Sequence, residues 1–467
     1  MIRNVLSIIL VMLFLGGCTM APKYTRPPAP IPKAWPEGDA YKDVKTGDAP
    51  SAAELKWRDL ISDKKLQKVI EMALANNRDF KLAALNVERA RAYYGIQRAE
   101  LLPALDAVGT GSRQRMPADL SNKKIAGVTE QYSVNLGVLS WEIDFFGRIR
   151  SLKDKALEEY LATEEAHRSA GIMLIAATAG AYLTYAADRE NLKLAEDTLK
   201  TQMNSYDLIK RRYDVGLASE LDLHRSQTQV DSAKENVYRY TQLVAQDENG
   251  LNLLAGKVVP GELLPDGLDS VIPPKDVSPG LSSEVLLKRP DIMASEHTLK
   301  SINAMIGAAR AAFFPRISLT TTMGTASAEL SRLFRSGQDT WNFAPQVVMP
   351  IFDARIWAAY DAAKVEREIA LARYEKTIQT AFREVADALA VRGTVEQQLA
   401  AQQSFVNATA ETYRLSNARY TKGIDSYLSV LDAQRSLFSA QQGLIALRLA
   451  KASNLVTLYK VLGWGNE

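Results

Sequence analysis

Two periods of alternation between polar and apolar residues run along this chain, and they predict helices in some segments and strands in others. Residues 64–98 and 282–312 are rich in Ala, Leu, Glu, Arg and Lys, and each run ends shortly before a proline. Residues 152–212 and 354–420 contain no proline, so they predict helical rods of roughly 60 residues, on the order of 90 Å long. A compact globular domain has no use for helices of that length.

Four shorter segments between the helical runs alternate with the period of a strand. The alternation is weak at residues 104–115 and 316–327 and strong in two others, where one face is oily and the opposite face is small or polar. The oily faces consist of Tyr132, Val134, Leu136 and Val138 in one segment and of Trp341, Phe343, Val347, Met349 and Ile351 in the other. This pattern is typical of a membrane β-barrel wall; the alternative is a small soluble sheet that caps a helical bundle.

If these strands cross a membrane, their number predicts self-assembly. Four strands cannot close a barrel, and a bilayer does not tolerate an open sheet edge. Two copies of the chain would supply about eight strands and three copies about twelve, and the larger barrel leaves room for passage. The alternation itself does not choose between the two.

The chain is also an imperfect duplication. Gly95 and Gly307 lie 212 residues apart, and farther along Gly216 and Gly423 lie 207 residues apart. Each copy has the same order: a helical run, a proline stop, a strand-like hairpin, and a very long helical run that a glycine interrupts. Other matched pairs at these spacings are Arg98 and Arg310, Arg148 and Arg355, Arg212 and Arg419, and Tyr213 and Tyr420.

The amino terminus indicates export and lipidation. An apolar run from Val5 to Leu15 follows Arg3, and Leu15-Gly16-Gly17-Cys18 resembles a bacterial lipobox. Cys18 is the only cysteine, which excludes an internal disulfide. A lipid on Cys18, followed by Thr19 instead of Asp, predicts delivery to the outer membrane. The alternative is a generic signal peptide with an incidental cysteine.

Six prolines between Pro22 and Pro36 exclude a helix after the signal and predict an extended segment. This segment is expected to be either a flexible tether or a strip laid along the protein. Beyond the signal, no stretch is a continuous run of the ~18 apolar residues that a transmembrane helix needs.

Composition narrows the function classes. The 57 basic and 54 acidic residues are spread along the chain with a net charge of +3, so no basic stripe predicts nucleic-acid binding. His167, His224 and His297 are isolated, and no phosphate-binding glycine motif is present. We therefore expect no catalysis, no metal, and no cofactor apart from the covalent lipid on Cys18.

Several motifs together resemble the TolC-like outer-membrane efflux factors, and among them the OprM-type lipoproteins. The motifs are the lipobox, Trp-Glu-Ile-Asp-Phe-Phe-Gly-Arg at 141–148, Arg-Pro-Asp-Ile at 289–292, Ala-Ala-Arg-Ala-Ala-Phe-Phe-Pro at 308–315 and Tyr-Leu-Ser-Val-Leu-Asp-Ala-Gln-Arg at 427–435. The resemblance implies an α+β membrane protein. Its homotrimer would form a twelve-stranded outer-membrane β-barrel, four strands per chain, continuous with a long periplasmic α-helical barrel and a mixed equatorial region.

The resemblance also implies a function, a location and partners. The function is a passive exit duct of a tripartite drug efflux pump, anchored in and spanning the outer membrane of a Gram-negative bacterium and extending into its periplasm. The partners are a periplasmic adaptor and an inner-membrane resistance-nodulation-division pump. The alternatives are a non-conducting structural envelope lipoprotein, or the same duct serving metal-ion or peptide export.

Glycines mark the expected periplasmic tip. Gly216 and Gly423 interrupt the long helical runs, and we expect each to turn the chain back at the tip. Ser219 and Asp222 form an S-x-x-D pattern that predicts a cap for the first returning helix.

The second returning helix carries the candidate gate. Leu428, Asp432 and Arg435 recur at i, i+4 and i+7, so they share one helix face. The resemblance implies that three-fold symmetry turns Leu428 and Asp432 into rings that close the duct, with Arg435 within reach of an Asp432. The alternative is an exposed Asp–Arg pair with no gating role.

Two positions depart from the TolC pattern. Ser429 stands where a second acidic ring needs a carboxylate, and Asp425 replaces a tip arginine. A TolC-style latch between helices at these positions is therefore not expected, and opening is expected to follow contact with adaptor and pump.

The expected domain organisation follows from these features. It consists of a signal peptide (1–17), an acylated proline-rich extension (18–63), a first repeat (64–255) with a hairpin at about 103–146, an equatorial linker (256–281), a second repeat (282–462) with a hairpin at about 315–352, and a C-terminal tail (463–467).

Overall fold

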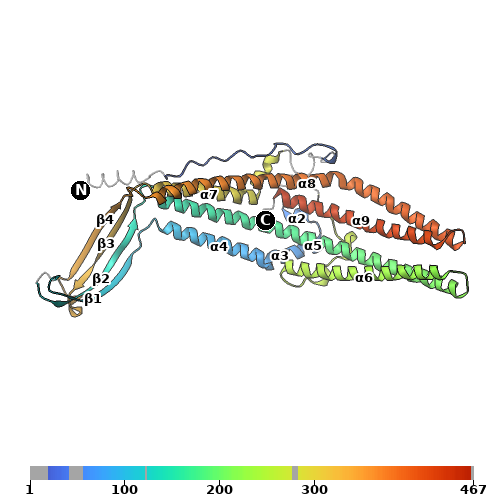
Figure 1. The fold of residues 1–467 in the computed structure, drawn as a ribbon, viewed down its shortest axis with the longest axis horizontal. Coiled ribbons are helices and arrows are strands. Elements are labelled where there is room, and N and C mark those ends of the chain that lie inside the picture. The colour runs from blue at the N-terminus through green and yellow to red at the C-terminus, as the bar shows by residue number, and fades with distance from the viewer. Residues whose placement is uncertain (1–18, 42–55, 121–123, 276–281, 464–467) are drawn as a thin grey trace. The chain divides into compact units, whose positions relative to one another are not determined.

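The computed structural model describes residues 19–41, 56–120, 124–275 and 282–463 (Figure 1). The predicted signal peptide and Cys18 lie outside the described residues. The chain forms two compact units, each built from several stretches of sequence. Unit 1 comprises Met1–Pro28, Asn86–Glu164 and Ala294–Tyr374, and unit 2 comprises Ala29–Leu85, Glu165–Met293 and Glu375–Glu467.

Unit 1 contains one antiparallel sheet of four strands in the order β1-β2-β3-β4. The strands are β1 (Asp106–Met116), β2 (Gly127–Glu142), β3 (Arg316–Ser327) and β4 (Asp339–Val348). The two predicted hairpins are joined because β2 pairs with β3, with Leu136 opposite Met323. The strand predicted at 316–327 is confirmed. The prediction that the last strand reaches Ile351 is wrong: β4 ends at Val348, because Pro350 has no N–H for the ladder.

The sheet presents its apolar residues to the outside. Every residue of β4 is exposed, and Trp341 is 81% exposed although it is a large apolar side chain. Among the described residues of unit 1, no helix covers this face, and β1 and β4 are the two edges of the sheet. A sheet with oily residues outside and unpaired edges is suited to lipid and to pairing with further copies of itself.

Four long helices enter unit 1 and pack through small side chains. They are α4 (Arg78–Ala99), α5 (Arg148–Asp214), α7 (Pro290–Ala311) and α8 (Ala354–Thr421). Each of these helices is divided between the two units, so unit 1 contains only one part of each. Ile306 and Ala309 of α7 are buried against Ala363 of α8, with Tyr360 beside them. The rods predicted at 152–212 and 354–420 are confirmed: α5 extends beyond its predicted range at both ends, and α8 ends one residue later than predicted.

The proline-rich N-terminal segment lies along the protein, which is the second of the two predicted alternatives. In unit 1, Asn303 of α7 donates to the Pro22 carbonyl at 2.8 Å, and both Tyr24 and Arg26 donate to the buried carboxylate of Glu296. Burial raises the pKa of Glu296, but the hydrogen bond from Arg26 and the charge of Lys300 outweigh it, so the net pKa is lowered. The segment is therefore held by a charged anchor.

Close backbone contact holds the same segment at two helix glycines. A Cβ on Gly307 of α7 would lie 2.7 Å from the backbone N of Ala21 in unit 1. In unit 2, a Cβ on Gly393 of α8 would collide with the carbonyl group of Ala40, while Trp35 stacks on Phe382 at 5.4 Å. Glycine is required at both places because any side chain would push the segment away.

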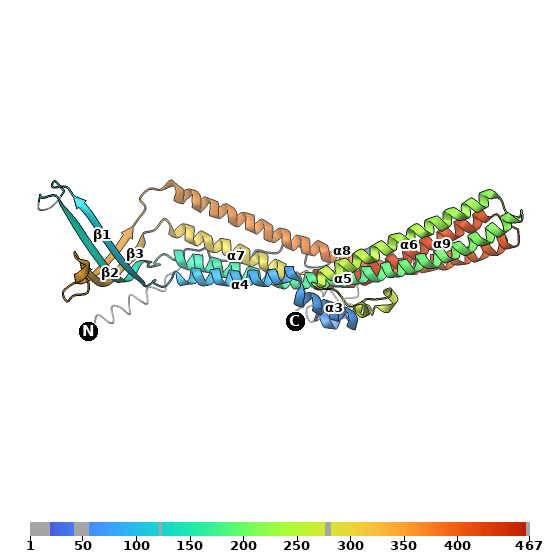
Figure 2. The same ribbon diagram turned by 90° about the horizontal axis from the view of Figure 1, so that it is seen from below.

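In unit 2, α6 (Glu220–Ala255) and α9 (Tyr427–Leu462) return alongside α5 and α8 (Figure 2). The smaller elements are α2 (Trp57–Leu60), α3 (Lys64–Asn76) and the 3-10 helices η1 (Asp39–Tyr41), η3 (Gly261–Leu263), η4 (Leu268–Ser270) and η5 (Ser283–Lys288). Unit 1 holds one more 3-10 helix, η6 (Leu330–Arg332). Trp57, Leu60 and Ile61 are buried, so part of the predicted extension belongs to the core.

Two helix predictions are corrected in this unit. The run predicted at 64–98 is split, because the Asn77 side chain accepts from the Phe80 N–H at 2.9 Å and starts α4 as a new helix. The run predicted at 282–312 begins with a 3-10 helix instead of an α-helix. Arg289, which precedes Pro290, is extended, as the residue before a proline prefers.

Each returning helix is held at its base by an equivalent contact. The Asn77 amide donates to the Leu254 carbonyl of α6 at 3.0 Å, and the Arg289 guanidinium donates to the Val461 carbonyl of α9 at 2.6 Å. Asn77 and Arg289 are 212 residues apart and Leu254 and Val461 are 207 apart, which are the spacings of the duplication. Arg289 is buried and also pairs with Asp291 and Glu384. Both copies thus hold the end of the returning helix at equivalent positions, but with different side chains.

One helix departs from the expectation that no segment beyond the signal is apolar enough to cross a membrane. Within the described residues, α5 contains an 18-residue stretch that passes this test by length and composition. Of that stretch, 61% is buried inside the protein, as Tyr182, Leu183 and Ala186 illustrate. Packing within the helical core accounts for its apolar character.

Two partly buried aspartates on neighbouring helices interact in unit 2, Asp188 on α5 and Asp247 on α6, and the Oδ2 atom of Asp247 is buried without a hydrogen-bond partner. Burial and then the charge of Asp188 raise the pKa of Asp247 to about 6, and burial likewise raises the pKa of Asp188. Arg239 and Asn191 act in the opposite direction on Asp188. Asp247 is therefore protonated in mildly acidic solution.

This pair predicts that stability falls as the pH rises above the ordinary aspartate range. The pKa of Asp247 is about 6 in the folded protein and 3.8 ordinarily, so the folded state holds an extra proton between these values, and the contribution is lost as the pH rises through about 6. We expect Asp247→Asn to flatten the pH dependence of the thermal unfolding midpoint and to raise that midpoint at about pH 7. Asp231→Asn, at an exposed aspartate of α6, is the control and should follow the wild-type curve. A curve for Asp247→Asn that matches the wild type would contradict the raised pKa of Asp247.

Candidate functional site

Two equivalent turns close the ends of the long helices in unit 2. Gly216 follows α5 with φ +78°, and Gly423 follows α8 with φ +72°. Leu217 N–H bonds the Arg212 carbonyl at 2.7 Å, and Ile424 N–H bonds the Arg419 carbonyl at 3.0 Å. Together with the bonds from the two glycine N–H groups, this is a Schellman motif in both copies. Glycine is needed because its left-handed conformation strains other residues.

Ser219 begins the first returning helix. Its hydroxyl oxygen accepts from the Asp222 N–H at 3.1 Å and donates to the Asp222 carboxylate at 2.8 Å, so the two side chains form a closed cap on α6. The negative charge of Asp222 in the first turn also favours the helix dipole. Ser219 and Asp222 therefore stabilise the start of α6 through contacts within the first turn.

The second turn is held differently. Ser426 is the N-cap residue of α9 but makes no side-chain cap bond. Instead, Arg419 at the end of α8 binds Asp425 through two bonds of 2.5 and 3.0 Å. Sequence reasoning missed this ion pair, because the equivalent position of the first copy is Ala218 and the duplication gave no signal for it.

A small core joins the two turns. Ile209 of α5 is buried together with Tyr427, Val430 and Leu431 of α9. The Arg212 guanidinium lies 5.1 Å from the centre of the Tyr420 ring, which connects the ends of α5 and α8. This core fixes one face of α9 against the rest of the unit, and the opposite face stays free.

The free face of α9 carries the three residues of the predicted gate. Leu428 is 41% exposed, and the side chains of Asp432 and Arg435 are 64% and 57% exposed. Arg435 donates to the Asp432 carboxylate at 3.1 Å. The single chain thus brings all three together on one stripe, and Arg435 also borders a small pocket beside Gln202 of α5 and Asn236 of α6. Ser429 is also exposed.

The turns also expose aliphatic side chains that sequence reasoning did not single out. Val215, Leu217 and Ile424 flank the two glycines and are 68%, 70% and 59% exposed. Their positions next to the turn glycines were the signal that could have revealed them. An apolar rim at the end of a helical unit is a feature that partner proteins use.

Of the three histidines, His224 lies beside Glu220 at the start of α6, and the other two belong to other parts of the fold. His167 stacks on Phe80 at 4.6 Å, and His297 contacts Glu158 at 2.6 Å. In the part of the chain that the structure describes, no three His, Cys, Asp or Glu side chains gather in a way that could hold a metal ion.

Comparison with known proteins adds independent information. The sequence profile of the family "Outer membrane efflux protein" matches residues 69–257 and 281–464. The toluene efflux pump outer membrane protein TtgC of Pseudomonas putida is 49% identical over 467 residues, with 100% of this chain and 96% of the relative covered. The antibiotic efflux pump outer membrane protein ArpC of Pseudomonas putida is also 49% identical, with the same 100% and 96% coverage. The open-state crystal structure of the Neisseria gonorrhoeae MtrE outer membrane channel has a TM-score of 0.85 at 37% identity, with 96% of this chain and 98% of that chain covered.

The turn geometry predicts a local effect of Gly216→Ala. A Cβ at φ +78° strains the Schellman motif by about 1 kcal/mol, so we expect roughly fivefold faster amide hydrogen exchange at the end of α5 and the start of α6. Gly180→Ala is the matched control, because Gly180 lies within α5 with nothing near its Cβ position. Equal exchange in Gly216→Ala and wild type would contradict the strain.

Proposed function

Because the chain belongs to the outer membrane efflux protein family, we propose that the exposed stripe of α9 is the gate of its channel. The protein is a trimeric outer-membrane channel that serves as the exit duct of an efflux pump, and it is not an enzyme. Leu428, Asp432 and Arg435 are the gate residues. The observation that carries this proposal is that all three lie on the face of α9 that is not packed in the small core between the two turns.

Symmetry converts this stripe into a closure. In a three-fold assembly each residue of the stripe recurs three times around the axis. Three Leu428 side chains form an apolar ring that opposes the passage of water and ions, and three Asp432 side chains form an acidic ring one turn away. Arg435 lies 3.1 Å from Asp432 within its own chain, and it neutralises the carboxylates that would otherwise repel one another.

The electrostatic contacts that hold the proposed gate closed are weak. The Asp432–Arg435 pair is more than half exposed, so its contribution is about 0.5 kcal/mol or less per chain. Ser429 supplies no second acidic ring, and Asp425 is occupied by Arg419 of its own turn. Closure therefore depends on helix packing with a small electrostatic addition, and a partner that favours a different packing opens it.

We propose that the tip binds a periplasmic adaptor and, through it, an inner-membrane resistance-nodulation-division pump. Val215, Leu217 and Ile424 give each chain an apolar rim beside the gate. Burial of this rim against a partner provides the differential contact energy that shifts the packing of α9.

The proposed substrates are organic solvents and antibiotics. Two relatives at 49% identity are named as parts of efflux pumps, one for toluene and the other for antibiotics. A duct that accepts both exerts little selection of its own, so selection belongs to the inner-membrane pump.

We further propose that Cys18 carries the lipid anchor. Leu15-Gly16-Gly17-Cys18 supports this assignment, and Thr19 begins the segment that is held along unit 1. The lipid is then attached to a fixed part of the protein instead of a loose tether.

Single-channel conductance in a planar bilayer tests the gate. Loss of about 1.5 kcal/mol over three Asp432–Arg435 pairs shifts the ratio of open to closed channels by about tenfold. We expect Asp432→Ala and Arg435→Ala to show this increase, while the wild type stays mostly closed.

A matched ion pair provides the control. Asp231 and Lys234 form an exposed i,i+3 pair on α6, the other returning helix. Asp231→Ala and Lys234→Ala should conduct like the wild type. If these control variants open the channel as much as the gate variants, surface charge and not the gate controls conductance.

Metabolic labelling with palmitate tests the lipid anchor. Because Cys18 is the only cysteine, we expect Cys18→Ser to lose all of the label while the trimer still assembles through its strands. Any remaining label in Cys18→Ser would place the lipid elsewhere and contradict the assignment.

A further inference from the structure

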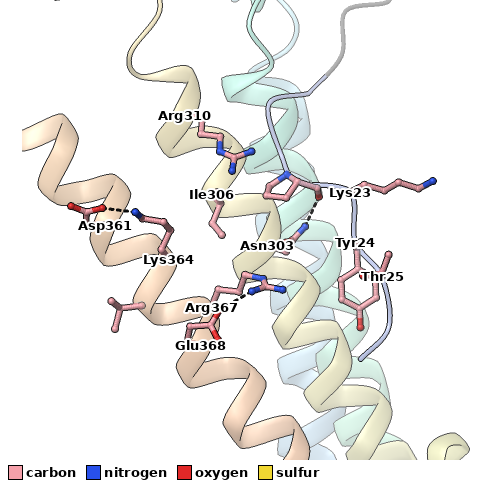
Figure 3. A pocket seen from close by; sticks show the side chains of 12 residues that line it. Lys23, Tyr24, Thr25, Asn303, Ile306, Arg310, Asp361, Lys364, Arg367 and Glu368 are labelled. Carbon is pink, nitrogen blue, oxygen red and sulfur yellow. Dashed lines mark hydrogen bonds and ion pairs between the residues drawn. The ribbon is translucent and has the colours of Figure 1, made fainter. Parts of the chain in front are cut away.

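A groove of about 590 Å³ lies in unit 1 between the N-terminal segment, α7 and α8 (Figure 3). Its walls include Lys23 of the segment, Arg310 of α7, and Lys364 and Arg367 of α8. Figure 3 shows Arg367 extending from α8 toward α7, and the N-terminal segment passing close to α7. The groove is distinct from the tip and takes no part in the gate.

The charges in the groove leave a net positive site. Lys364 is paired with Asp361 at 2.7 Å, and Arg367 is paired with Glu368 at 2.7 Å. Arg310 has no carboxylate partner among the described residues. Its guanidinium contacts only neutral oxygens, the Tyr360 hydroxyl at 3.3 Å and the Met20 carbonyl at 3.4 Å. A half-buried arginine without a carboxylate partner is well placed to bind an anion.

The position of Arg310 indicates which anion. Arg310 is the residue before the last of α7, and β3 of the membrane sheet begins at Arg316, so Arg310 lies at the boundary between helix and strand. Phe313 packs edge to face on Trp357 at 4.8 Å, and Trp357 is 62% exposed. Exposed tryptophan beside tyrosine marks the level of the lipid headgroups in membrane proteins.

We propose that this groove binds the phosphate headgroup of an anionic phospholipid in the periplasmic leaflet of the outer membrane. The planar guanidinium of Arg310 matches a phosphate with two parallel hydrogen bonds, and Lys364 and Arg367 add a favourable field. The acyl chains continue past Phe313 and Trp357 toward the sheet. The proposal depends on the membrane location of the sheet and is independent of the gate and of the lipid on Cys18.

The first copy of the duplication has no such site, which shows that the groove is not a general feature of the helix ends. Arg98 is the counterpart of Arg310, but it is exposed and has Leu101 where the second copy has Phe313. The counterpart of Trp357 is Arg150, which pairs with Asp144. Arg98 therefore supplies a control with the same charge at an equivalent place.

Native mass spectrometry of the delipidated trimer tests the proposal, with short-chain phosphatidylglycerol and phosphatidylcholine as probes. We expect one phosphatidylglycerol per chain on the wild type and weaker binding of phosphatidylcholine. Arg310→Gln should weaken phosphatidylglycerol binding by about tenfold, and Arg98→Gln should leave it unchanged. Equal weakening by both variants, or equal binding of both lipids, would overturn the proposal.

Two further experiments distinguish a phospholipid in the groove from free phosphate and from a second copy of the chain. Inorganic phosphate at the lipid concentration should not displace phosphatidylglycerol; displacement would assign the groove to free phosphate. If Arg310→Gln dissociates the trimer but leaves lipid binding per chain intact, the groove is a contact between copies of the chain and the lipid assignment fails. If Arg310→Gln does not fold, Lys364→Gln takes its place, and unchanged affinity in that variant overturns the proposal.

Discussion

A backbone N–H or C=O group exposed to lipid has no water to bind, and the rest of this protein depends on that constraint. The four-stranded sheet leaves β1 and β4 with unpaired edges, and the exposed apolar residues of β4 turn to lipid. Such a sheet is stable in a bilayer only when further copies pair with both edges. Three copies supply twelve strands, and a barrel of that size encloses a passage. The single chain is therefore an incomplete structure, and the proposed gate residues on α9 are likewise exposed in it.

Duplication explains how one chain contains two similar helical pairs, of which we propose that only the second gates the channel. Both copies fix the base of their returning helix, one with Asn77 and the other with Arg289, and both use a glycine Schellman motif at the opposite end. Between these fixed ends the copies have diverged. The first copy closes its cap with Ser219 and Asp222, while the second keeps the serine as Ser426, has Ser429 in place of the aspartate, and presents Asp432 to the free face. The two pairs therefore match at their ends and differ on the face of the proposed gate.

Part of this structure follows from the sequence because local physics determines it. The long helices follow from the lack of proline, and the two turns follow from glycines at matched spacing. The break at Asn77 did not follow, because an asparagine within a helix-forming run acts as a cap only when its tertiary contact with Leu254 holds it there. The proline-rich segment was predicted as extended, but its course depends on partners far away in sequence, such as Glu296. In the candidate site, the shared face of Leu428, Asp432 and Arg435 follows from helix period, whereas the Arg419–Asp425 pair needs the geometry of the turn.

The close approach of the N-terminal segment to Gly307 and Gly393 also orders the events of biogenesis. Ala21 rests on α7 and Ala40 on α8, so each binding place is made of residues that the ribosome adds more than halfway through the chain. The part of the protein that is synthesised and exported first therefore reaches its final position among the last. Until then the segment has no helix to rest on, and it stays accessible for the proposed attachment of a lipid to Cys18.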